Sequence, residues 1–148
     1  MPEELTYTQD KFTFHVATDR YYNAAGVWAK AEGNLITVGV SDFFQQHNGD
    51  VAFVDVAEVG TAVSAGDEFA NIETIKVDIS FSSPLSGKVA EVNPLMDEAP
   101  EVINQDPYGG GWLAVIIPDD WEADRQRLLD ADAYFIRMQA EAQDQIGN

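Results

Sequence analysis

The sequence contains no cysteine, and its only candidate metal ligands of the imidazole type are His15 and His47. Without cysteine the chain cannot be a disulfide-stapled scaffold. The two histidines lie far apart in the sequence and have no thiolate to complete a ligand set, so a structural zinc site is not expected. Because the chain has no thiol of its own, any thiol–disulfide exchange at this protein requires an attached group.

Basic residues are also scarce. The chain has 8 lysine and arginine residues against 26 acidic ones, a formal net charge of -18. Such a surface repels phosphate backbones and anionic membranes, so neither nucleic acid nor lipid is an expected partner. It attracts basic docking surfaces on larger proteins, although solubility or a high-salt habitat explains the charge equally well.

Long apolar runs are absent as well. No stretch approaches the roughly 20 apolar residues of a membrane span, and the N-terminus shows no basic region followed by an apolar core. We therefore expect a cytoplasmic protein.

What the sequence does contain is a series of short apolar segments separated by glycine and proline. Its length of 148 residues suits one core. Strands are predicted at 21–30, 35–40, 51–56, 67–73, 77–82, 87–92 and 112–117. Many short strands with frequent turns predict a mainly β protein, a sandwich or flattened barrel.

Helices are expected at three places. Ser41 and Gly49 are typical of the start and end of a short helix, and residues 94–104 form a second helical segment. After Pro118, Asp119 is the expected cap of a C-terminal helix. The predicted organisation is an arm or edge strand over 1–20, a β domain over 21–118, and a C-terminal helix over 119–148 packed on it.

One lysine stands out. Lys76 lies in a short apolar run, and the residues on both of its sides alternate with the period of half-buried strands. Two such strands place Lys76 at a hairpin turn, pointing into water on a rigid support. The simpler interpretation is a solubilising charge, which is the usual role of a lysine between strands.

Autonomous catalytic sites are not indicated. The sequence has no Gly-x-Ser-x-Gly elbow, and nothing marks a catalytic pair among its carboxylates. Gly109-Gly110-Gly111 lacks the Lys-Ser or Lys-Thr of a phosphate loop and is typical of a tight turn. We therefore expect a carrier or substrate protein of a multi-enzyme system, with no catalytic residues and no metal.

Ordered blocks along the chain carry a family resemblance. They are Gly39–Phe43, Gly49–Val54, Val59–Val63, Gly66–Phe69, Ser83–Val89, Asn104–Leu113 and Leu128–Tyr134. In order and spacing they resemble the H protein of the glycine cleavage system and its relatives, over most of residues 21–135. The resemblance implies a lipoyl-domain fold of the barrel-sandwich hybrid type and a lipoyl carrier.

The same resemblance implies the site. Glu73-Thr74-Ile75-Lys76 matches the Glu-Ser-x-Lys motif of the family, with Thr in place of Ser. Lys76 is then the residue that bears lipoate through an amide bond, and Glu73 helps the attaching enzyme to recognise it. Amide formation removes the lysine charge and leaves a long flexible arm that ends in a dithiolane.

Two positions depart from the family pattern. The first hairpin of that family carries Ser-His-Glu-Trp, and an Asp follows the lipoyl lysine by four residues. This chain has Ala25-Gly26-Val27-Trp28 and Ser80, so both carboxylates that would hold a cationic aminomethyl group are missing. Asp78 is displaced by two positions, which keeps it on the same side of the strand.

These departures favour a sister group of the family. The segments Tyr22–Trp28 and Pro118–Trp121 resemble lipoate-binding proteins that serve heterodisulfide-reductase-like complexes in sulfur oxidation. Our leading expectation is therefore a carrier of sulfur intermediates, which is lipoylated by a lipoate–protein ligase or lipoyl transferase.

Two alternatives remain. One is the glycine-cleavage carrier of the aminomethyl group, with glycine decarboxylase, aminomethyltransferase and dihydrolipoyl dehydrogenase as partners. The other is a binding module that is never lipoylated.

Overall fold

A computed structural model describes residues 3–146, which form strands and short helices and a longer helix near the C-terminus. The strands are β1 (Glu4–Gln9), β2 (Phe12–Ala17), β3 (Tyr21–Tyr22), β4 (Val27–Glu32), β5 (Leu35–Val40), β6 (Val51–Val56), β7 (Ala62–Val63), β8 (Glu68–Thr74), β9 (Asp78–Ser82), β10 (Gly87–Val92) and β11 (Ala114–Pro118). The helices are α1 (Asp42–Asn48), α2 (Leu95–Glu98), α3 (Val102–Gln105), α4 (Trp121–Arg125) and α5 (Ala131–Ile146). No helix within residues 3–146 combines the length and apolar content needed to cross a bilayer.

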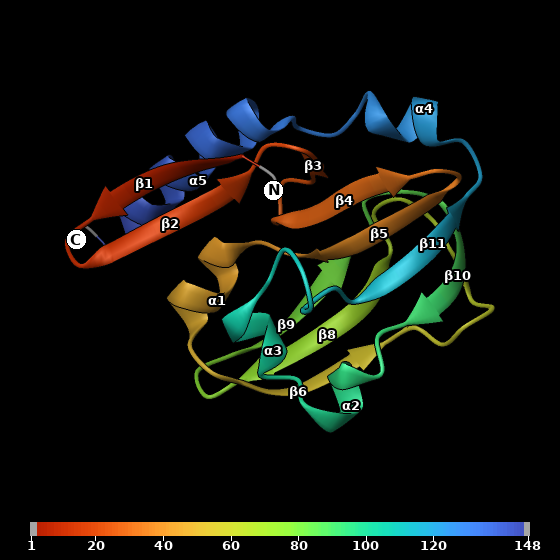
Figure 1. Cartoon of the computed structure of the whole chain (residues 1–148), viewed down its shortest axis with the longest axis horizontal. Helices are drawn as coiled ribbons and strands as arrows, with labels where there is room; N and C mark the ends of the chain where they lie inside the picture. Colours follow the sequence, from red (N-terminus) through yellow and green to blue (C-terminus); the bar gives the residue numbers. More distant parts are fainter. Residues whose placement is uncertain (1–2, 147–148) are drawn as a thin grey trace.

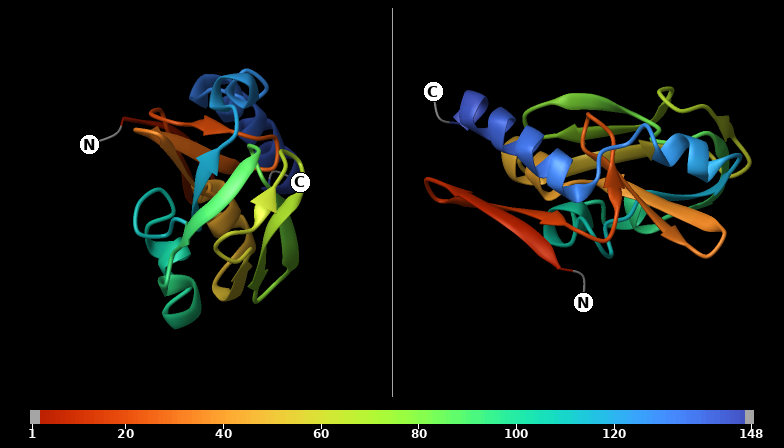
Figure 2. Two further views of the ribbon diagram at one scale, coloured as in Figure 1. Left: turned by 90° about the vertical axis from the view of Figure 1, so that its right-hand side faces the viewer. Right: turned by 90° about the horizontal axis from the view of Figure 1, so that it is seen from above.

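Two antiparallel sheets face each other. One has six strands in the order β3-β4-β5-β11-β10-β7, and the other has three in the order β6-β8-β9. Figures 1 and 2 show the two layers, with α5 and the β1–β2 hairpin together at one end. The strands pair within each sheet and leave the sheets open at their edges, so the predicted mainly β sandwich is confirmed and a closed barrel is not formed.

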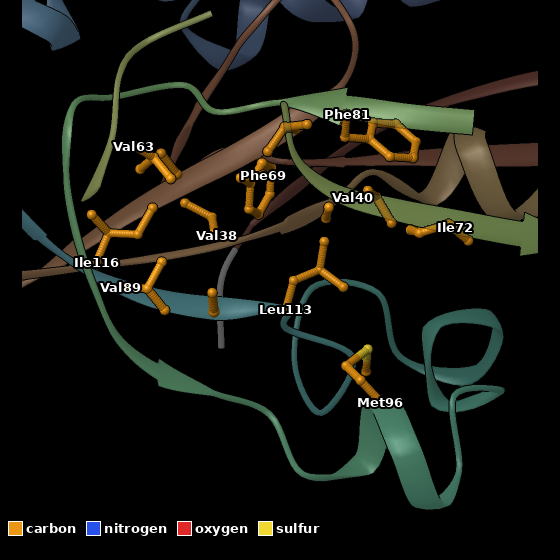
Figure 3. Packing of buried hydrophobic residues seen from close by; sticks show 14 of the residues in the cluster. Val38, Val40, Val63, Phe69, Ile72, Phe81, Val89, Met96, Leu113 and Ile116 are labelled. Carbon is orange, nitrogen blue, oxygen red and sulfur yellow. The ribbon is translucent and has the colours of Figure 1, made fainter. Parts of the chain in front are cut away.

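The space between the sheets is filled mostly by aliphatic side chains, and we call this buried cluster the sheet core. Val38, Val89 and Ile116 from the larger sheet face Phe69 and Ile72 from the smaller one (Figure 3). On β5 the buried residues Ile36, Val38 and Val40 follow the strand period, because successive residues of a strand point to opposite faces. On β8 a register shift between Glu68 and Ala70 lets both Phe69 and Ile72 reach the core, although they are three residues apart.

A second buried cluster lies outside the sandwich, and we call it the aromatic cluster. It brings together the β1–β2 hairpin, strands β3 and β4 of the larger sheet, and helices α1 and α5. Phe14 meets Phe43 edge to face with ring centroids 5.2 Å apart, and Tyr22 stacks on Tyr134 at 4.4 Å. The Nε1–H of Trp28 donates to the carbonyl oxygens of Val40 and Pro107, each at 3.1 Å, so the buried indole is satisfied.

The predicted strand over 21–30 is wrong in one respect: a turn divides it into β3 and β4. The Oδ1 atom of Asn23 accepts hydrogen bonds from the backbone N–H groups of Ala25 and Val27, both at 3.0 Å. Gly26 takes the left-handed conformation with φ 89°, which lets the chain reverse so that β3 pairs with β4.

The predicted C-terminal helix is confirmed, but its extent is wrong: the segment after Pro118 forms two separate helices, α4 and α5. Asp120, not Asp119, caps α4 by accepting from the N–H of Ala123 at 3.2 Å. The chain then leaves the helix because Leu129 and Tyr22 exchange two backbone hydrogen bonds, each 2.8 Å long. The helical segment predicted at 94–104 likewise consists of two short helices, α2 and α3.

Candidate functional site

Lys76 lies at the turn between β8 and β9, exposed as predicted. Thr74, only 6% exposed, shapes this turn. Its Oγ1 accepts from the backbone N–H groups of Lys76 and Val77, both at 3.1 Å, and its own N–H donates to the carbonyl of Val77 at 2.8 Å. The hydroxyl holds the turn closed, which fixes the point from which the lysine side chain leaves the protein.

The turn is fastened to the end of α1 (Figure 1). The N–H of Ile75 donates to the carbonyl of Asp50 at 3.1 Å, and the Nζ of Lys76 lies 3.5 Å from the carbonyl oxygen of His47. A cation is favoured beside the last carbonyls of a helix. Gly49 leaves room for this packing, since a Cβ there would lie 3.3 Å from the Cγ1 of Ile75.

Glu73 occupies β8 three residues before Lys76 and is exposed. It is paired with Phe53 on β6 and with Asp78 on β9. The structure therefore brings the two residues singled out from the sequence, Glu73 and Lys76, into one hairpin.

The two positions that depart from the family pattern have different surroundings. Val27 is fully buried in the sheet core, whereas Ser80 is exposed on β9. The Nδ2 of Asn71 donates to the Oγ of Ser80 at 3.2 Å. Neither position supplies a carboxylate.

A pocket of about 260 Å³ lies beside the turn, where α1, β9 and α5 meet. Its apolar wall includes Phe44, Ile79 and Phe81. Its polar wall includes Ser41, His47, Ser80, Tyr134 and Glu141. The pocket reaches His47, whose carbonyl is the neighbour of the Lys76 ammonium, so a group attached to Lys76 has a partly open pocket nearby.

Burial shifts the pKa values of Tyr134 and His47 in the polar wall of the pocket. The hydroxyls of Ser41 and Tyr134 lie 2.9 Å apart, and burial raises the pKa of Tyr134 against the opposing effect of that hydrogen bond. Desolvation lowers the pKa of His47, the charge of Lys76 lowers it further, and Glu141 acts in the opposite direction. Glu141 is the carboxylate that lines this pocket within the described chain.

These residues fit a covalently attached arm. The exposed primary amine of Lys76 can form an amide, and the pocket beside it combines apolar walls with hydroxyl, imidazole and carboxylate groups. Sequence reasoning located Glu73 and Lys76 but missed the structural role of Thr74 and the contribution of Tyr134 and Glu141. The last two reach the pocket only through the packing of α5.

Comparison with known proteins gives the family. Residues 20–141 match the family model described as glycine cleavage H-protein. The chain belongs to this family. It is 38% identical over 127 residues to the glycine cleavage system H protein of Thermus thermophilus, covering 86% of this chain and 98% of the relative. It is 40% identical over 134 residues to that of an Anaeromyxobacter species, covering 90% and 92%.

A solved structure agrees. The fold is similar to the crystal structure of a glycine cleavage system H protein from Mycobacterium marinum, with a TM-score of 0.72 and 32% sequence identity. The match covers 90% of this chain and 100% of that chain. Proteins of this family carry lipoate covalently on a lysine, so the predicted lipoyl carrier is confirmed. The relatives favour the glycine-cleavage alternative over the sulfur-oxidation carrier that we expected first.

Proposed function

We propose that Lys76 is the lysine that carries lipoate, and that the protein is the H-type carrier of a glycine cleavage system. The observation that carries this proposal is the geometry of Lys76: an exposed amine, on a turn fixed by Thr74, next to a partly open pocket. The matching motif Glu73-Thr74-Ile75-Lys76 supports the same assignment.

The bound lipoyl group would supply a dithiolane that opens to a dithiol and accepts a covalent cargo. The protein's own contribution is to hold and shelter. Thr74 fixes the direction in which Lys76 leaves the hairpin, and Phe44 and Phe81 give the neighbouring pocket an apolar wall. Glu141 offers the negative charge that a cationic aminomethyl cargo requires.

The partners of this function are a lipoate-attaching enzyme, glycine decarboxylase, aminomethyltransferase and dihydrolipoyl dehydrogenase. A tethered group visits each of them at an effective concentration of roughly millimolar, so weak docking is sufficient.

One observation favours the sulfur carrier as a second candidate. Val27 and Ser80 stand where the family resemblance places carboxylates, and a sulfur cargo needs no such negatively charged groups. The structure also shows that Val27 cannot simply be replaced by Glu, because the new carboxylate would be buried in the sheet core.

The test is lipoylation of the full chain followed by glycine–carbon dioxide exchange with glycine decarboxylase. Wild type and the control Lys88→Arg should gain the mass of one lipoyl amide, while Lys76→Arg should gain none and keep its fold, since both lysines are exposed. Lipoylation that persists in Lys76→Arg would contradict the assignment of Lys76 as the lipoylated residue. Lipoylated wild type that fails to support exchange, with the modification verified by mass, would place the sulfur carrier first.

A further inference from the structure

An exposed aromatic side chain lies on the sheet face next to Lys76. Phe53 on β6 is 68% exposed, although phenylalanine is usually buried. It is paired with Glu73, and Glu73 is paired with Asp78, so these three residues form one row across the three-stranded sheet. We call this row, together with Asp55 two residues further along β6, the Phe53 face.

The Phe53 face carries uncompensated negative charge. Asp55 and Phe53 share one side of β6, and no ion pair involving Asp55, Glu73 or Asp78 occurs in residues 3–146. The ion pairs of the described chain use other carboxylates, such as Asp19 and Glu122. An apolar centre with a charged rim is the arrangement of a protein-binding surface, and the charge here requires a basic partner.

We propose that the Phe53 face is the docking surface for the enzyme that attaches the lipoyl group to Lys76, and that this enzyme presents basic side chains around an apolar slot. The inference rests on the proposed assignment of Lys76. Glu73 lies three residues from Lys76, so the Cα atoms of the two residues are at most about 11 Å apart, the reach of three extended residues.

Distance distinguishes this enzyme from the other partners. The attaching enzyme must bring the Nζ of Lys76 itself into its active site, so it covers the surface around the hairpin. In that step the unprotonated amine attacks the carbonyl carbon of a lipoyl adenylate. A C–N bond forms, the C–O bond to phosphate breaks, AMP leaves and the nitrogen loses a proton. Enzymes that act on the far end of the arm do not need to touch the Phe53 face.

A single exposed apolar side chain is common on protein surfaces, so the test needs a matched control. Ile136 on α5 is also 68% exposed, and α5 packs mainly on the N-terminal hairpin and β3. The experiment measures kcat/KM for lipoylation of full-length chain by a purified lipoate–protein ligase with lipoate and ATP, followed by intact mass. Circular dichroism verifies the fold of each variant.

Phe53→Ser should lower kcat/KM about tenfold, mainly through KM, whereas Ile136→Ser should stay within about twofold of wild type. Equal rates for Phe53→Ser and Ile136→Ser, with wild type lipoylated, would overturn the docking surface and leave the Lys76 assignment intact. Wild type that is never lipoylated would overturn both.

The charged rim gives a second, independent measurement. Added salt should slow lipoylation of wild type, and Asp55→Asn with Asp78→Asn should flatten this salt dependence. Asp132→Asn, an exposed carboxylate change on α5, should leave it unchanged. A salt dependence that is the same in all three proteins would contradict a basic partner at this face.

Discussion

The two buried clusters of this molecule differ in composition and in the way they are held. The sheet core is mostly aliphatic and is built by facing strands, whereas the aromatic cluster joins the N-terminal hairpin, α1 and α5 around Trp28. Polar groups are part of the aromatic cluster's packing: the Tyr22 hydroxyl donates to the carbonyl of Ala17 at 2.7 Å. The guanidinium of Arg20 lies 4.6 Å from the centre of the Trp28 ring.

The two clusters support different parts of the candidate site. Lys76 and Thr74 belong to the three-stranded sheet, which the sheet core supports from behind. The neighbouring pocket takes Phe44 and Phe81 from the sheet core but Phe43 and Tyr134 from the aromatic cluster. The attachment point thus depends on one cluster, and the shape of the pocket depends on both.

Removing one large side chain from each cluster tests this division. Trp28→Ala should lower the free energy of unfolding by about 3–5 kcal/mol, and Ile72→Ala by about 2–5 kcal/mol, because both side chains are almost completely buried. Amide hydrogen exchange should distinguish the two variants. Trp28→Ala should mainly increase exchange in residues 12–22 and 131–142, whereas Ile72→Ala should increase it in residues 68–82. Indistinguishable exchange patterns in the two variants would mean that the clusters unfold as one unit.

The sheet core could be predicted from the sequence because its residues follow the period of a strand. Ile36, Val38 and Val40 recur at every second position, and a strand can be recognised from this local pattern alone. The aromatic cluster could not, because Phe14 and Phe43 come from segments separated by three strands and the turns between them. The break before α5 also escaped prediction, since it depends on the pairing of Leu129 with Tyr22.

The site shows the same contrast. Lys76 and its turn were predictable because the flanking strands and the motif are contiguous in sequence. The pocket was not, because Ser41 and Tyr134, whose hydroxyls lie 2.9 Å apart, are separated by 93 residues. Ser41 was expected to cap α1, but its side chain makes no capping hydrogen bond and is directed to Tyr134 instead. Long-range packing of this kind leaves no local periodicity.

Alkaline pH should weaken the aromatic cluster selectively. Burial raises the pKa of Tyr22, Tyr108 and Tyr134, whereas the described residues of the sheet core include no tyrosine. Above about pH 10 an unfolded chain releases these phenolic protons while the native state keeps them. The native state then binds more protons, so stability falls as pH rises, by up to about 1.4 kcal/mol per pH unit for each tyrosine.

Urea unfolding at a series of pH values above 10 measures this slope. Tyr134→Phe should reduce the slope by the share of one tyrosine, although it also removes the hydrogen bond to Ser41 and so lowers stability at neutral pH by about 1 kcal/mol. Tyr7→Phe, which changes a half-buried tyrosine at the edge of the cluster, is the control. A slope unaffected by Tyr134→Phe would show that the buried phenols do not set the alkaline limit.

The smallest expected effect is an electrostatic one at the boundary between the clusters. Desolvation and then the charge of Lys76 lower the pKa of His47, while Glu141 opposes them. Since the native pKa of His47 lies below the unfolded value of about 6.5, this group contributes stability at neutral pH that is lost as pH falls below that value.

Lys76→Gln removes the nearby positive charge and, like amide formation, should raise the pKa of His47 toward its ordinary value. Titration of the His47 imidazole by NMR measures the change, and Lys88→Gln, on the opposite sheet, should produce none. Lipoylated wild type should follow Lys76→Gln in this titration, because both side chains carry an uncharged amide in place of the ammonium group. A His47 that titrates identically in all of these proteins would show that the charge of Lys76 does not influence the pocket.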